Sequence, residues 1–208
     1  MTELERAVDA AFVRTGRGLS HWPDPHPDRA PLDEEYSRSL DPLKWRIVPA
    51  WAEAWCDAAV ELGIATLERA CVPRWAVDDG ARYRRVDRLI PNAVGALPMT
   101  LAYAGSDGER PTGVTIALGH PAVVFGSSPA CGCDACDAGS QNELDHLDAQ
   151  VRDVVSGQVR HLSAADRTIV ASSTGWSATG SFGRSEVDEV LADPKGWVEV
   201  SGASWLDG

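Results

Sequence analysis

Hydrophobic residues recur with helical spacing in two segments of the first third of the chain. Apolar side chains from Leu4 to Phe12 lie three or four residues apart, which predicts a short amphipathic helix over 2–14. From 49 to 71 apolar residues cover most faces of a helix, so we expect a long central helix that is buried around most of its circumference. The segment 22–31 between them holds four prolines, which predicts an extended connector.

The middle of the chain has the pattern of short strands. Apolar segments at 83–90, 99–103, 114–118 and 122–125 are separated by turns rich in Gly, Pro, Asn and Asp. Connections this short join neighbouring strands that run in opposite directions. The segments therefore predict an antiparallel meander.

Helical spacing returns near residue 140. Leu144, Leu147 and Val151 would lie on one face of a helix that ends before Gly157. Ser140, with Glu three residues later, has the spacing of a capping box. We expect a second helix to begin at this point.

These elements together predict an α+β fold, in which an antiparallel meander packs against the long buried helix and the second helix. The remaining expected elements are strands near 158–162 and 168–172, a short helix over 185–193 and a strand over 197–200. We expect residues 1–28 to form an N-terminal helix and proline-rich connector. Residues 29–208 would then form a single α+β domain.

Charge and length narrow the classes of function. The 208 residues carry 31 acidic and 19 basic side chains, a formal net charge of −12, which would repel the phosphates of a nucleic acid. No apolar run approaches the roughly 20 residues that span a bilayer, and the N-terminus lacks a secretion signal. We expect a cytoplasmic protein that binds neither nucleic acid nor membrane, and whose partner is an unidentified protein or small molecule.

Three of the five cysteines lie within six residues, as Cys131, Cys133 and Cys136. Thiolates are the ligands that structural zinc sites use most, and a pair separated by two residues is the usual element of such sites. The loop Cys131–Cys136 therefore predicts a zinc ion, and we expect that ion to be structural. The other two cysteines, Cys56 and Cys71, are expected to be small apolar core residues.

A tetrahedral zinc site needs a fourth ligand, which the cysteine loop does not supply. His120 lies near the loop in sequence and is our expected fourth ligand. We expect His146 to point into solvent, on the polar face of its helix. The other residues that could supply the ligand are His161, Asp134 and Asp137.

Other chemistry at the cysteine loop remains open. The spacing of Cys133 and Cys136 is also that of thiol oxidoreductases, although the neighbouring Asp134 and Asp137 would raise the pKa of the thiols. A zinc-assisted hydrolase is a further alternative, and so are thiols without a ligand. We favour an interaction or small-ligand-binding module, with an enzyme that uses the cysteine centre as the alternative.

Arginines are concentrated beside the first predicted strand. They could form a patch that binds anions or an acidic partner, or they could be surface residues that neutralise neighbouring acidic groups. The cluster consists of Arg69, Arg74, Arg82, Arg84, Arg85 and Arg88.

The chain resembles an actinobacterial family of domains of unknown function. The resemblance rests on the cysteine loop with Asp137, on 154–157, and on the segments 186–194 and 196–202. It extends from about Arg29 to the C-terminus. The resemblance implies a single cytosolic domain built around the cysteine loop, and it assigns no catalytic residue.

Overall fold

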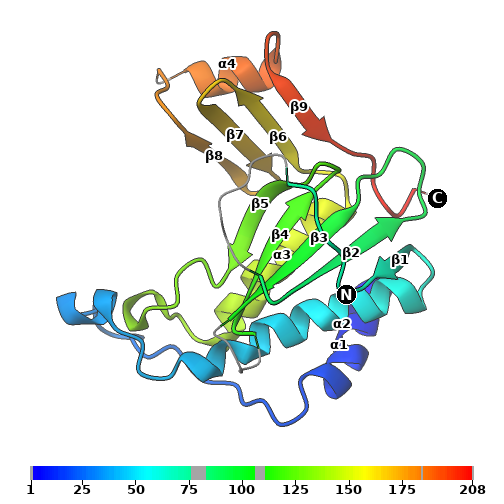
Figure 1. Ribbon diagram of the computed structural model, residues 1–208. Coiled ribbons are helices and arrows are strands. Elements are labelled where there is room, and N and C mark those ends of the chain that lie inside the picture. Colours follow the sequence, from blue (N-terminus) through cyan, green and yellow to red (C-terminus); the bar gives the residue numbers. More distant parts are fainter. Residues whose placement is uncertain (1, 76–82, 106–110, 184, 208) are drawn as a thin grey trace.

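The computed structural model describes residues 2–75, 83–105, 111–183 and 185–207. Within them the chain forms helices and two antiparallel sheets, which confirms the expected α+β fold (Figure 1). Arg82 of the arginine cluster lies outside the described residues. No helix in the described part of the chain combines the length and the apolar character needed to cross a membrane.

The first sheet is the expected meander with one additional strand. Its order is β1-β2-β3-β4-β5, and each strand is antiparallel to the next. The strands are β1 (Ala65–Glu68), β2 (Arg85–Pro91), β3 (Met99–Ala104), β4 (Gly113–Leu118) and β5 (Val123–Ser128).

The additional strand, β1, corrects the predicted extent of the central helix. Helix α2 spans Ile47–Glu61 and does not continue to Cys71. Gly63 follows it with a φ of +69°, a conformation that glycine adopts without strain. The chain turns there and enters the sheet as β1, which pairs with β2.

Helices α2 and α3 lie against the first sheet and contact each other, while α1 packs on α2. Helix α1 spans Glu3–Thr15 and α3 spans Ser140–Val155. The expected capping box is wrong, because Gly139 is the N-cap of α3 and Ser140 is already helical. Glu143 instead accepts a hydrogen bond from the Ser128 hydroxyl at 3.2 Å.

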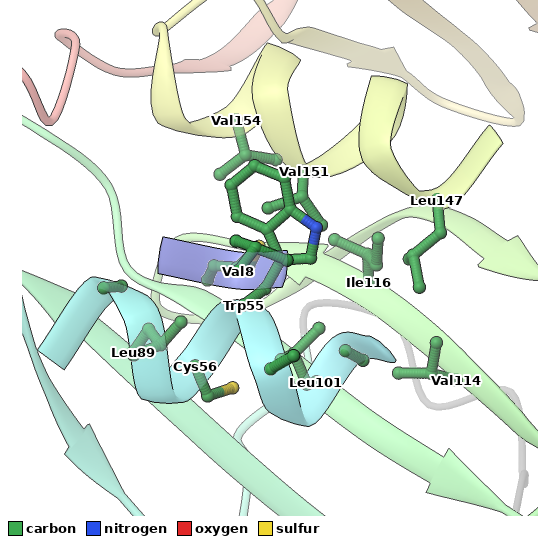
Figure 2. Packing of buried hydrophobic residues seen from close by; sticks show 14 of the residues in the cluster. Val8, Trp55, Cys56, Leu89, Leu101, Val114, Ile116, Leu147, Val151 and Val154 are labelled. Carbon is green, nitrogen blue, oxygen red and sulfur yellow. The ribbon is translucent and has the colours of Figure 1, made fainter. Parts of the chain in front are cut away.

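The main core fills the space between the helices and the first sheet. Figure 2 shows Trp55 of α2 beside Val151 and Val154 of α3, with strand residues such as Ile116 next to them. Trp55 keeps 2% of its surface exposed, and Cys56 is fully buried in the same core, as expected. Cys71, in contrast, is only partly buried.

The last quarter of the chain, from residue 160 on, forms a second sheet, which the sequence did not predict as a separate layer. Its order is β8-β7-β6-β9, and α4 (Glu186–Ala192) packs with it (Figure 1). β8 has no counterpart among the expected strands, since every residue in it is exposed and no apolar alternation marks it. The strands are β6 (Arg160–Ala164), β7 (Arg167–Ser172), β8 (Gly175–Thr179) and β9 (Val198–Ser201).

Candidate metal centre

The cysteine loop connects β5 to α3 and contains one short 3-10 turn, η3 (Asp134–Cys136). It is attached to the segment 16–46 between α1 and α2, which contains the proline-rich stretch and is called the connector from this point on. The amide of Asp134 donates to the carbonyl of Arg38 at 2.9 Å, and the Arg38 Nε donates to the Asp134 carboxylate at 2.9 Å. The same carboxylate accepts from the amide of Leu40 at 3.1 Å, so both of its oxygens are used.

Asp137 attaches the other end of the loop. Its carboxylate is nearly inaccessible and accepts from the indole Nε1 of Trp22 at 2.9 Å and from the amide of Gly139 at 2.9 Å. Lys44 also forms an ion pair with the Asp137 carboxylate. Trp22 thus anchors the connector to the cysteine loop.

A buried carboxylate supports the loop from the connector side. Glu35 lies in a second 3-10 turn, η1 (Asp33–Ser37), and retains 4% of its surface. Arg29 donates to both of its oxygens at 2.9 Å, and Arg38 donates to one at 3.2 Å. Arg29, followed by the amide of Leu32, holds the pKa of Glu35 well below its usual range. Arg38 therefore bridges Glu35 and Asp134. Arg29, Glu35 and Arg38 together form a charged support for the loop.

The three thiols converge on the outer side of this support. The Sγ atoms of Cys131, Cys133 and Cys136 all lie within 4.8 Å of one another, and the first two are 3.2 Å apart. Tetrahedral zinc with Zn–S bonds of about 2.3 Å needs sulfurs about 3.8 Å apart. One pair is closer than this and no pair is farther apart than 4.8 Å, so shifts of no more than about 1 Å reach that geometry and the donor set fits zinc.

The thiols share hydrogen bonds, and these change their acidity in opposite directions. Hydrogen bonds from Cys131 and Cys136 lower the pKa of Cys133. The bond with Cys133, followed by the one with Cys131, raises the pKa of Cys136 to about 11. The rise in pKa expected from Asp134 and Asp137 is thus not the net result at Cys133, where hydrogen bonds from the other two thiols lower the pKa. The two carboxylates are themselves paired with Arg38 and Lys44.

The structure does not bring His120 to the cysteines. His120 precedes β5 and the cysteines follow it, and a strand of six residues is about 20 Å long. The His120 ring lies 3.3 Å from Arg88. His146 is exposed, as expected, and contacts Gln150 at 2.9 Å, while His161 belongs to β6 of the second sheet.

Sequence reasoning missed a neighbour of the loop, the indole of Trp45. Trp45 is 2% exposed, and its Nε1 has no hydrogen-bond partner among the described residues. A Cβ placed on Gly132 would lie 4.0 Å from this nitrogen, so the buried donor lies next to the cysteine loop. Buried donors without partners are rare in folded proteins, and this one is available to a group bound at the loop.

Searches of curated proteins and of solved structures returned no match. A family does match, the Family of unknown function (DUF6226), over residues 8–205. The match begins earlier than the resemblance seen from sequence motifs and includes most of α1 and the whole connector. Because it covers nearly the entire chain, both sheets and the cysteine loop, the protein belongs to the Family of unknown function (DUF6226).

Proposed function

We propose that Cys131, Cys133 and Cys136 bind one zinc ion with a structural role, and that the chain is an interaction or small-ligand-binding module. The observation that carries the proposal is the approach of the three Sγ atoms to within 4.8 Å of one another. Soft thiolates select zinc over the harder divalent cations, magnesium and calcium. Zinc would supply ligand bonds that close the loop.

The surroundings of the loop support a structural role. Gly132 and Ala135 offer little side-chain surface for packing, so ligand bonds would add to the hydrogen bonds of Asp134 in holding the loop. Arg38 and Lys44 attach the same loop to the connector. A metal bound here would hold together the connector, the loop and the start of α3.

A site with three ligands from the chain leaves a fourth position for another group. Among the described residues no histidine, aspartate, glutamate or further cysteine joins the three thiols. In a binding module, a side chain of a partner protein or a small molecule would take this position. All five cysteines are free thiols, and we further propose a cytoplasmic location, where thiols stay reduced.

The open position also supports a second candidate, a zinc-assisted hydrolase. Catalytic zinc sites combine three protein ligands with one water molecule, whereas structural sites usually have four protein ligands. The absence of a fourth ligand among the described residues is the observation that favours this candidate.

Metal content tests the proposal. We expect about one zinc per chain by elemental analysis of protein purified without added zinc, and loss of that zinc in Cys133→Ser. Cys71→Ser is the matched control, because Cys71 lies outside the cluster and is partly buried. Chelation should lower the melting temperature of the wild type and of Cys71→Ser, since ligand bonds contribute to folding free energy.

Two results would overturn the structural zinc site. One is wild-type protein without stoichiometric metal, and the other is equal metal loss in Cys71→Ser. If Cys133→Ser does not fold, the absorption spectrum of the cobalt-substituted wild type serves instead, because thiolate-to-cobalt bands report sulfur ligation. Zinc removal that leaves the melting temperature unchanged but abolishes hydrolysis of a model ester would favour the hydrolase.

A further inference from the structure

A cleft of about 800 Å³ lies where the end of α1 meets the start of α2. Its walls come from the end of α1, the first turns of α2 and the start of β2. Its volume falls in the range of sites that hold small molecules. Among the described residues, four arginines line it, Arg14, Arg17, Arg46 and Arg85, and Glu53 is the one acidic residue of the lining. This concentration of positive charge occurs in a chain with a net charge of −12.

Two of the four arginines are already neutralised. Arg14 pairs with Asp57 at 2.7 Å, and Arg85 pairs with Glu53 at 2.5 Å. The guanidinium of Arg85 also stacks on the ring of Tyr103, 4.0 Å from its centroid. These contacts fix the two side chains as walls of the cleft.

The described residues offer no such partner to the other two arginines. In the described ranges, neither Arg17 nor Arg46 has a carboxylate within 4.0 Å. Within the described part of the chain, the buried Nε of Arg46 has no hydrogen-bond acceptor, and the buried hydroxyl of Thr15, another lining residue, has no partner. Because buried polar atoms are nearly always hydrogen-bonded, these two atoms indicate a missing partner.

Charge and shape together define the chemistry of that partner. Arg46 precedes the first turn of α2, whose N-terminal end carries a positive partial charge and favours anions. Leu19, Pro49 and Ala50 give the same cleft an apolar part. An anionic group beside Arg46, with a hydrocarbon part on Leu19 and Pro49, would satisfy both features.

We propose that this cleft binds a small organic anion that carries a phosphate or carboxylate group. Arg46 and Arg17 would contact the anionic group, and the Thr15 hydroxyl would donate to it. The site uses none of the cysteines, so it stands or fails independently of the zinc site. The proposed ligand is an anion, although the net negative charge of the chain alone would argue against anion binding.

Calorimetric titration tests the proposal with three probes of similar size, phenyl phosphate, benzoate and the uncharged benzyl alcohol. We expect saturable binding of at least one of the two anions, with one site per chain, and no binding of benzyl alcohol. Preference between the anions identifies the group that the cleft accepts. None of the three probes is a strong zinc chelator, so the measurement is insensitive to metal at the cysteines.

Three arginine variants test whether the anion binds in this cleft. Arg46→Gln should weaken anion binding at least tenfold, because a hydrogen bond between two charged groups is lost. Arg17→Gln, on the exposed side of the cleft, should weaken it severalfold. Arg74→Gln removes the same charge from an exposed residue outside the cleft and should leave affinity within twofold.

Three outcomes would overturn the proposal: no binding of either anion, equal binding of benzyl alcohol, or equal losses of affinity in the Arg74 and Arg46 variants. Arg46 lies at the start of α2, and its variant is checked for folding by circular dichroism. Should it not fold, Arg17→Gln and the charge reversal Arg17→Glu decide the question, because Arg17 is exposed.

Discussion

The two sheets of the molecule differ in how well their apolar faces are covered. The first sheet packs against α2 and α3, with α1 packed on α2, and its core extends from Leu4 in α1 to Trp205 near the C-terminus. The second sheet has a small core, in which only Leu162, Ile169, Val187 and Val190 are buried among the described residues. Every residue of β8 is exposed, whereas five of the six residues in β3 are buried.

This difference has a consequence for function. Burial of apolar surface supplies most of the stability of a domain, so the first region should be far more resistant to unfolding than the second. The cysteine loop and the arginine cleft both belong to the first region. Sites that must hold several side chains in fixed positions are best built on such rigid elements.

The largest expected effect compares one leucine from each core. Leu101 in β3 and Leu162 in β6 are both buried, with 1% and 0% of their surface exposed. Leu101→Ala should lower the free energy of global unfolding by about 3–5 kcal/mol, because it opens a cavity in the main core. Leu162→Ala should cost about 2–3 kcal/mol and act mainly on the second sheet. Urea denaturation and amide hydrogen exchange measure the two effects.

Hydrogen exchange separates the two variants. In Leu162→Ala we expect faster exchange in β6, β7 and β9, with protection in β3 and β4 retained. In Leu101→Ala we expect protection to fall in both sheets. Uniform loss of protection in Leu162→Ala would show that the two regions unfold as one unit and do not differ in stability.

The second prediction concerns the junction of the two regions, at Gly157. This glycine has a φ of +69°, and a Cβ on it would lie 2.7 Å from the carbonyl oxygen of Gly202 and from the amide nitrogen of Ser204. Gly157→Ala should therefore cost about 2–4 kcal/mol in the free energy of unfolding, from backbone strain and from the clash. Thermal and urea denaturation measure the loss.

Gly63 provides a matched control for the junction. It has the same φ of +69°, but nothing lies within 4 Å of an added Cβ. Gly63→Ala should therefore cost only the strain of the left-handed conformation, about 1–2 kcal/mol. Equal losses at the two glycines would mean that the close approach of the C-terminal segment to Gly157 contributes nothing to stability.

The smallest expected effect is a difference in pH response. Burial lowers the pKa of His161 in β6, so its neutral form is favoured and the second sheet loses stability as pH falls below 6.5. In the first region, burial raises the pKa values of Glu143 and Asp148. Their protonated forms are favoured, so this contribution to stability grows as pH falls from 7 toward 5.

Local opening energies from hydrogen exchange at pH 7 and pH 5, corrected for intrinsic exchange rates, test the opposite signs. We expect the strands of the second sheet to open more readily at pH 5, and those of the first sheet to be unchanged or more protected. His161→Leu should abolish the response of the second sheet. A response that persists in this variant would assign the effect to other groups.

The sequence predicted the first region much better than the second. Helices α1 and α3 and strands β2–β5 follow from apolar spacing, because one face of each packs on the main core. The end of α2 was missed because Ile64 and Leu67 continue the helical spacing past Gly63, although they belong to the turn and to β1. β8 was missed because no face of it is buried.

The candidate sites, too, could be predicted only where their residues are close in sequence. The three cysteines are close in sequence, so their convergence could be predicted. The partners of the Asp134 and Asp137 carboxylates, Arg38 and Lys44, are distant in sequence and could not. His120 is near the loop in sequence, yet β5 separates them in space. The arginine cleft draws on residues from Arg14 to Pro111, and only the tertiary packing of α1, α2 and the first sheet brings them together.

The position of Trp205 determines how the second sheet can open. Its side chain is buried in the main core, its amide donates to the carbonyl of Val155 at 2.8 Å, and its indole donates to the carbonyl of Leu97 at 3.2 Å. The chain from β6 to β9 therefore forms a loop whose two ends, Val155 and Trp205, are held side by side by a hydrogen bond and by core packing. An unfolded loop with fixed ends gains less entropy than a free tail. Closure by Trp205 thus favours refolding of a sheet whose own core is small.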